Sequence, residues 1–197
     1  MLSAGEEDGG GGGPPSAKSP PRTPRFGVDG THMATDSTLY ANPLVQALQE
    51  GRYEDNSGRV LSTPDLMDGS RVIGLYCSAS WCGPCKEFTP KLAEYYRAYQ
   101  RKFPRTMDIV FLSLDRTAAD WSTYRAGMPW LAWTAVDSQY IMDLVHVSSI
   151  PQLVFVNPGT GEILCPDGRK VVLGDPAASH PLFPRMGPTT RSALDSV

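Results

Sequence analysis

The chain has 197 residues, which is enough for one ordinary domain with a sizeable hydrophobic core. Its formal net charge of −3 gives no indication of a nucleic-acid-binding surface. No stretch reaches the roughly 18 uninterrupted apolar residues of a membrane span. From the charge and the apolar pattern together, we expect neither nucleic acid nor membrane as a partner. Four cysteines are too few for a disulfide-stabilised scaffold, which favours a reducing compartment.

Residues 1–35 have low complexity, and eleven of the first 25 residues are glycine or proline. Such a segment cannot bury enough apolar surface to offset its conformational entropy, so we predict a disordered tail. Basic residues beside serines and prolines would suit a docking or phosphorylated segment, but a solvated linker is the interpretation we favour. The segment lacks the apolar run of a secretory signal and has early acids, unlike a transit peptide. This predicts a cytoplasmic location, with the nucleus as an alternative.

Residues 36–184 are predicted to form the folded domain, and residues 185–197 a flexible C-terminal tail. The domain begins with short elements and turn signals: a helix over 43–49, a turn at 56–58, a strand over 59–61, a helix-start signal at 62–65 and a turn at 68–69.

A cysteine pair, Cys82 and Cys85, lies between a predicted strand and a predicted helix. The strand covers 71–77, a short apolar run that is partly β-branched. The helix covers 86–100, where apolar residues recur at helical spacing. Cys82 is therefore expected at or next to a helix N-terminus, where unpaired backbone N–H groups and the helix dipole favour a thiolate over a thiol.

Three interpretations of this C-x-x-C pair are available. A zinc site needs about four ligands, yet there is no second C-x-x-C and the three histidines are scattered. An inert structural pair is disfavoured, because cysteines in the first turn of a helix are poorly placed to be buried. Redox chemistry is favoured, because a strand-to-helix junction is the context that this chemistry requires. We expect neither a metal nor a cofactor.

Downstream of this helix, a second buried strand is predicted over 107–114. Asp115 is expected to cap a helix over 118–127 that Gly127 ends. Two strands joined by a helix form a parallel crossover unit, which is nearly always right-handed. The following segment, 128–132, is expected to plug the core with its tryptophan, the alternative being a wall beside the cysteine pair.

The last elements alternate between short helices and strands. They are a helix over 138–145, a strand over 152–156, a turn over 157–161, a strand over 162–165 that completes an antiparallel hairpin, and an edge strand over 170–173. Pro151 precedes the first of these strands, a position that proline tolerates.

Three other side chains are candidates for chemistry. Cys77 is expected to be inert core packing on the opposite side of its strand from Tyr76. Cys165, beside Pro166, is a candidate site for glutathionylation or dimer formation, although exposure alone does not make a thiol reactive. For His146, we favour a structural role on the surface or in the core over a role in acid–base catalysis.

Four sequence blocks carry a family resemblance. W-C-G-P-C-K at 81–86, followed by Pro90, resembles the active site of thioredoxins. The wider pattern resembles the nucleoredoxin and tryparedoxin branch of that superfamily over roughly residues 40–184. Its blocks are Y-C-S-A-S-W-C at 76–82, F-T-P-K-L at 88–92, M-P-W-L-A at 128–132 and S-I-P-Q-L at 149–153.

Two positions depart from the family pattern. Position 83 is glycine, as in thioredoxin, where the nucleoredoxin and tryparedoxin branch usually has proline. Tyr76 stands six residues before Cys82, where thioredoxin has a buried acid. The chain therefore has no carboxylate at this position to deprotonate the resolving cysteine.

The resemblance implies a thioredoxin-like α/β fold, a central mixed sheet with helices on both faces. It implies that Cys82 is the nucleophile and Cys85 the resolving cysteine in thiol–disulfide exchange. Supporting roles are implied for Trp81, which shields the sulfurs, for Gly83 and Pro84, which shape the loop, and for Ile150 and Pro151, whose cis peptide would offer a docking edge to a substrate.

The resemblance also implies the partners. A monomeric protein-disulfide reductase of the nucleoredoxin type would act on protein disulfides and be reduced again by a reductase, glutathione or another dithiol. Two alternatives stay open: a tryparedoxin-like electron carrier from a low-molecular-weight dithiol to peroxidases, and a redox-gated binding module.

Overall fold

The computed structural model describes residues 42–61, 72–134 and 138–182. The predicted tails at 1–35 and 185–197, the helix-start signal at 62–65 and the turn at 68–69 lie outside these ranges. None of the described helices combines the length and the apolar composition needed to cross a membrane.

The described residues form a seven-stranded sheet in the order β2-β1-β5-β4-β3-β6-β7. The strands are β1 (Tyr53–Glu54), β2 (Val60–Leu61), β3 (Val72–Ser78), β4 (Met107–Ser113), β5 (Leu131–Trp133), β6 (Gln152–Val156) and β7 (Ile163–Cys165). The β3–β4 and β4–β5 pairs are parallel, and the other pairs are antiparallel. The mixed sheet confirms the expected thioredoxin-like fold class.

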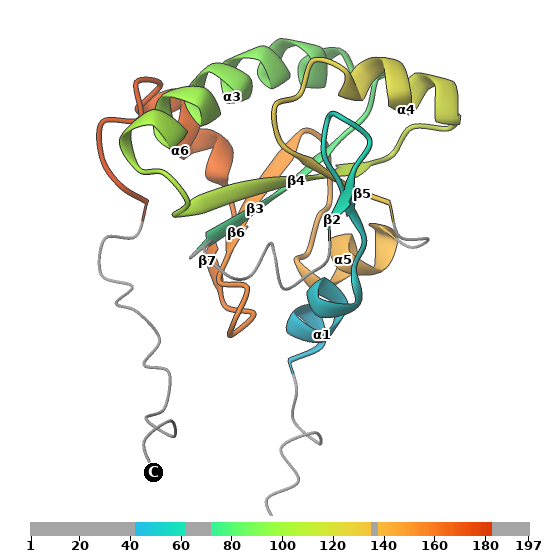
Figure 1. Ribbon diagram of the computed structural model, residues 1–197, viewed down its shortest axis with the longest axis horizontal. Helices are drawn as coiled ribbons and strands as arrows, with labels where there is room; N and C mark the ends of the chain where they lie inside the picture. Colours follow the sequence, from blue (N-terminus) through green and yellow to red (C-terminus); the bar gives the residue numbers. More distant parts are fainter. Residues whose placement is uncertain (1–41, 62–71, 135–137, 183–197) are drawn as a thin grey trace, which may run out of the picture. The chain divides into compact units, whose positions relative to one another are not determined.

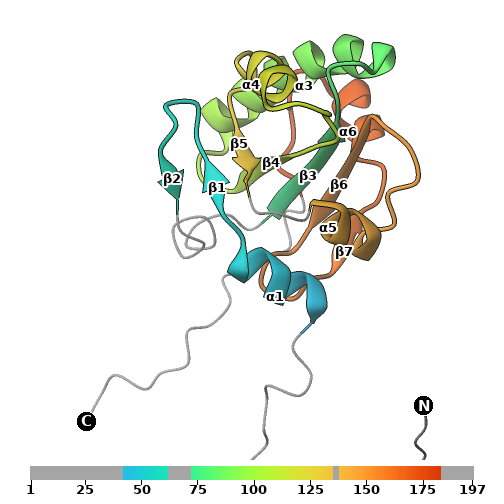
Figure 2. The ribbon, with the colours of Figure 1, turned by 90° about the vertical axis from the view of Figure 1, so that its right-hand side faces the viewer.

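Helices cover both faces of this sheet (Figures 1 and 2). On one face lie α3 (Gly83–Lys102), α4 (Ala118–Arg125) and α6 (Gly168–Gly174), and on the other lie α1 (Pro43–Glu50) and α5 (Ser138–Leu144). Each layer encloses its own apolar core. The central strand β3 is therefore buried along its whole length, which explains its nearly continuous apolar sequence.

Alternation along β3 sends Tyr76 and Cys77 to opposite cores, as predicted. Tyr76 faces the α3 side, whereas Cys77 is fully buried on the α5 side. Burial raises the pKa of the Cys77 thiol to about 12, so this thiol stays protonated at neutral pH. The prediction that Cys77 is inert packing is confirmed.

The segment 128–132 plugs the core, as predicted. Trp130 is only 2% exposed and packs edge-on against the rings of Tyr76 and Tyr96, with centroid separations of 5.9 and 5.8 Å. Ala132 lies in β5, where it pairs with Phe111 of β4. The alternative of a wall beside the cysteine pair is not what these contacts show.

The edge strand predicted over 170–173 is wrong, because this segment lies in α6. Its paired valines resemble a strand, but the two buried positions, Gly168 and Val172, are four residues apart and so share one face of a helix. That face packs against β6 and α3. Tertiary packing therefore overrides the β-branched local sequence.

This packing predicts that Gly168→Ala destabilises the protein. A Cβ atom at position 168 would stand 2.7 Å from Phe155 Cε2 and 2.9 Å from Leu153 Cγ, closer than carbon atoms approach. Forcing an extra methyl into a packed core costs about 1–3 kcal/mol. Gly174→Ala is the matched control, because nothing lies within 4 Å of a Cβ atom there. Urea denaturation should show a loss for Gly168→Ala alone, and equal stability of the two variants would contradict the packing.

Candidate active site

The cysteine pair begins helix α3. Cys82 is the N-cap residue, and its Sγ accepts a hydrogen bond of 3.2 Å from the backbone N–H of Cys85. Serine, threonine or aspartate usually fills this position, because the first N–H groups of a helix have no partner within it. Pro84, in the first turn, has no N–H that needs a partner. The sulfur of Cys82 therefore stands where a helix favours negative charge.

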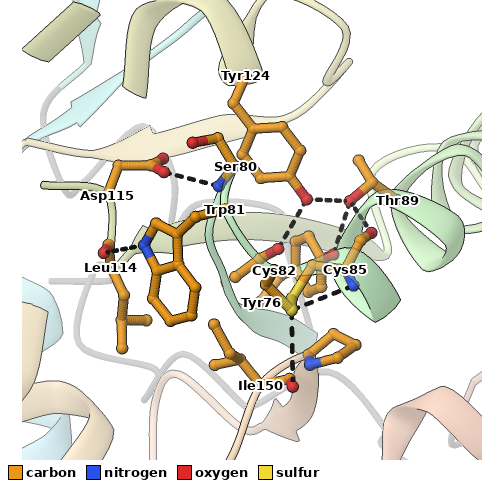
Figure 3. The surroundings of a disulfide bond; sticks show 12 residues. Tyr76, Ser80, Trp81, Cys82, Cys85, Thr89, Leu114, Asp115, Tyr124 and Ile150 are labelled. Carbon is orange, nitrogen blue, oxygen red and sulfur yellow. Dashed lines mark hydrogen bonds between the residues drawn. A yellow bond between two sulfur atoms is a disulfide. The ribbon is translucent and has the colours of Figure 1, made fainter. Parts of the chain in front are cut away.

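The two cysteines differ in their exposure to solvent. Cys82 and Cys85 form a disulfide with a Cα–Cα distance of 5.2 Å (Figure 3). The Cys82 residue remains 7% exposed, whereas Cys85 is 0% exposed. Of the two cysteines, only Cys82 therefore has surface exposed to solvent.

The loop before β6 approaches the same sulfur. The Ile150–Pro151 peptide bond is cis, as the resemblance implied. Ile150 packs against the cysteine pair, and its carbonyl oxygen lies 3.8 Å from Cys82 Sγ. In the reduced state the Cys82 thiol can donate its S–H to this oxygen, which favours the protonated form and opposes the effect of the Cys85 N–H.

Trp81 lies half-exposed beside Cys82. Its indole Nε1 donates to the carbonyl oxygen of Leu114 at 3.1 Å, so the ring is anchored although 53% of the residue is exposed. The guanidinium of Arg116 covers the ring face, with Cζ 5.7 Å from the ring centroid. The expected role of Trp81 in shielding the sulfurs stays a prediction.

Asp115 does not cap the helix that follows it, so that prediction is wrong. Thr117 caps α4 by accepting from the Asp120 N–H, and the helix ends at Arg125, two residues before the predicted Gly127. The Asp115 carboxylate instead accepts from the backbone N–H of Ser80 at 2.7 Å. This bond ties the loop before the cysteine pair to the end of β4 (Figure 3).

Four hydroxyl groups meet beneath the first turns of α3. Thr89 Oγ1 donates to the Cys85 carbonyl at 2.8 Å. Because a hydroxyl has one hydrogen, the hydroxyls of Tyr76, at 2.8 Å, and Tyr124, at 2.6 Å, must both donate to Thr89. The Tyr124 hydroxyl has no second hydrogen, so Ser78 Oγ, 2.8 Å away, donates to it. This hydroxyl network joins β3, α3 and α4 at Cys85 (Figure 3).

One member of the hydroxyl network, Tyr76, occupies the sequence position at which thioredoxins have a buried acid. Burial raises the pKa of the Tyr76 phenol well above its ordinary range, so Tyr76 remains a neutral donor. Within the described residues, the contacts of the network include no carboxylate. The site therefore orders the backbone of Cys85 through neutral hydrogen bonds.

Comparison with known proteins identifies the family. A family model described as Thioredoxin-like matches residues 69–163. A tryparedoxin from Trypanosoma brucei brucei is 35% identical over 113 residues, which cover 56% of this chain and 77% of that protein. The solved structure of tryparedoxin II from C. fasciculata covers 72% of this chain and 97% of its own, with a TM-score of 0.62 and 31% identity. The chain belongs to the thioredoxin superfamily, in its tryparedoxin- and nucleoredoxin-like branch.

Human nucleoredoxin is 36% identical over 123 residues, but this match covers 61% of the present chain and only 27% of nucleoredoxin. The chain thus corresponds to most of a tryparedoxin and to a minor part of a nucleoredoxin. It is a thioredoxin-like oxidoreductase of this type.

The structure brings the predicted site residues together from two segments. Trp81, Cys82, Gly83, Pro84 and Cys85 form the β3–α3 junction, and Ile150 and Pro151 approach it from the loop before β6. A Cβ atom at Gly83 would meet nothing within 4 Å, so sterically this position can hold another residue, such as the proline usual in this branch.

The other candidates differ in their surroundings. His146 is exposed, five residues before Pro151 in the chain, and Cys165 is a half-buried free thiol on β7.

Sequence reasoning missed several residues at this site. Thr89 could have been found, because it lies one helical turn after Cys85 and shares its inner face. Tyr124, Arg116 and Arg169 come from other elements, and no local pattern places them there. Arg169 stacks on the Phe88 ring at 5.4 Å and donates to the carbonyl of Pro151 at 3.3 Å.

The hydroxyl network predicts that Thr89→Val destabilises the oxidised protein. The change keeps the side-chain shape but removes the acceptor of the Tyr76 and Tyr124 hydroxyls, of which Tyr124 can still donate to Ser78 Oγ at 2.8 Å. Each buried polar group left unpaired costs about 1–3 kcal/mol. Thr89→Ser retains the hydroxyl and is the control. In urea denaturation, the serine variant should have a clearly higher free energy of unfolding than the valine variant. Equal losses of unfolding free energy would show that the hydrogen bonds of the network contribute nothing to stability.

Proposed function

We propose that this protein reduces disulfide bonds in other proteins through the Cys82–Cys85 dithiol. The observation that carries the proposal is the asymmetry of the pair. Cys82 is reachable and caps α3, whereas Cys85 is fully buried directly behind it. One sulfur can therefore attack a substrate while the other waits, protected from solvent, to complete the reaction.

The reaction proceeds in two exchange steps. The Cys82 thiolate attacks one sulfur of the substrate disulfide, which forms a Cys82–substrate mixed disulfide and releases the other substrate sulfur as a thiolate. The Cys85 thiolate then attacks Cys82 Sγ, which forms the Cys82–Cys85 bond and releases the second substrate thiolate. Two electrons pass from the dithiol to the substrate, and each released thiolate takes a proton from solvent.

The loop at Ile150 supplies a docking edge in this proposal. Its carbonyl oxygen already lies 3.8 Å from Cys82 Sγ, so an extended substrate segment that pairs with this backbone would bring its disulfide to the reachable sulfur. Trp81 borders the same sulfur with an exposed ring, which offers apolar area to the substrate.

A donor must reduce the protein again after each turnover. We propose a reductase, glutathione or another dithiol in this role, acting on a monomeric protein in the cytoplasm or nucleus. The second candidate function is that of a tryparedoxin-like carrier between a low-molecular-weight dithiol and peroxidases. The match to 77% of the length of a tryparedoxin supports it. A redox-gated binding module is the third.

The proposed roles predict a difference between the two cysteine variants. Cys85→Ser should accumulate a mixed disulfide through Cys82, because the second exchange step is blocked. Cys82→Ser should trap little substrate, because Cys85 is buried. Non-reducing electrophoresis after incubation with insulin measures both. Equal trapping by the two variants would contradict the assignment of nucleophile and resolving cysteine.

The three candidate functions separate in an activity assay. Insulin reduction by the intact protein, driven in turn by thioredoxin reductase, by glutathione and by a small dithiol, tests the reductase. Activity only when a peroxidase serves as the acceptor would indicate the carrier. A binding module would retain its partner after Cys82→Ser and would reduce neither acceptor.

A further inference from the structure

Arg116 places a positive charge over the ring of Trp81, the residue that directly precedes Cys82. It lies in the loop between β4 and α4, where its guanidinium covers the Trp81 ring at 5.7 Å. The ring is anchored in turn by its hydrogen bond to Leu114, and Trp81 directly precedes Cys82. The charge is therefore held over an anchored ring that adjoins the cysteine pair.

The guanidinium of Arg116 is exposed and forms no salt bridge with the described part of the chain. Within residues 42–61, 72–134 and 138–182, no carboxylate lies within salt-bridge distance of it. The adjacent Asp115 turns inward, where its oxygens accept from the Ser80 N–H and the Ser113 hydroxyl. An exposed, unpaired guanidinium offers several donors to a carboxylate and attracts anions from solution.

The other charges near the cysteine pair do not cancel this field. Lys86 and Glu87 follow Cys85 in the chain, are both exposed and offset each other. Arg169 adds a second cation beside Pro151. Asp115, whose carboxylate accepts from the Ser80 N–H, is a further acidic group of this region. With it and Arg116 both counted, the charges named here still leave an excess of one positive charge, on a chain whose net charge is −3.

We propose that Arg116 makes this site select disulfides that carry a carboxylate beside the sulfur and reject those with a neighbouring cation. Glutathione disulfide and protein segments with Asp or Glu next to the cystine share this chemistry. The inference rests on the proposed exchange reaction and names its substrate class. Charges at such a surface act mainly on the rate of encounter, and salt screens them.

The test compares three small disulfides in a single turnover. Full-length protein is reduced, freed of reductant and mixed with glutathione disulfide, which is anionic, cystamine, which is cationic, or hydroxyethyl disulfide, which is neutral. Acid quenching and alkylation then report the loss of the free Cys82 thiol by mass spectrometry. No electron donor is needed, because the protein supplies both electrons.

Arg116→Glu should lower the rate constant for glutathione disulfide by about threefold to tenfold and raise that for cystamine by a similar factor. The rate with hydroxyethyl disulfide should not change. Both effects should nearly vanish at about 1 M salt, where the Debye length is only about 3 Å. Arg116→Gln should fall between the wild type and Arg116→Glu.

Arg101→Glu is the matched control, because it makes the same change in net charge on an exposed residue at the other end of α3. At 1.5 Å per residue it lies roughly 27 Å along the helix from the cysteine pair, beyond the Debye length at ordinary salt. The ratio of its rate constant for glutathione disulfide to that for cystamine should equal the wild-type ratio. A cystine peptide with flanking glutamates shows whether a protein segment is selected in the same way as glutathione disulfide.

For each anionic disulfide, glutathione disulfide or the glutamate peptide, the rate constant is divided by that for cystamine. If Arg116→Glu leaves both of these ratios at their wild-type values, the proposal is overturned. An equal fall for all disulfides, the neutral one included, would also overturn it, since this would show that Arg116 only holds Trp81 in place. If the wild type reduces none of them, the proposed function itself fails.

Discussion

The hydrogen bond from the Cys85 N–H to Cys82 Sγ is the interaction on which the site depends. It makes a cysteine the cap of a 20-residue helix, so the reactive sulfur and the start of the helix are one structural feature. The buried strand β3 fixes where this helix begins, because its seven residues are enclosed on both faces. The sheet therefore places the sulfur, and the helix determines which protonation state is favoured there.

The residues around the cysteine pair hold its backbone in place without a fully buried carboxylate. The hydroxyl network holds the carbonyl of Cys85, and Asp115 holds the loop on the other side of the pair through Ser80. A neutral network avoids the desolvation penalty of a buried carboxylate. The charged groups beside the pair are the half-buried carboxylate of Asp115 and the exposed guanidinium of Arg116, which covers Trp81.

The sequence predicted the elements whose pattern is long and repetitive. The strands β3, β4 and β6 and the helix α3 were found within a few residues, because continuous burial and helical spacing mark them. The cysteine pair was found because both residues lie in one short segment. The segment in α6 was mistaken for a strand because four residues are too few to distinguish the two periods. Asp115, Tyr124 and Arg116 act across elements, so their roles depend on packing that no local pattern records.

The most direct test of this account is the reactivity of the Cys82 thiol against pH. Iodoacetamide alkylation of the reduced protein, followed by mass spectrometry of the Cys82 peptide, reports the thiolate at this residue alone. If the start of α3 activates the sulfur, the midpoint lies well below about 8.5, the ordinary pKa of a free cysteine. A midpoint at or above that value would show that the nearby Ile150 carbonyl outweighs the helix, and it would contradict Cys82 as the activated nucleophile.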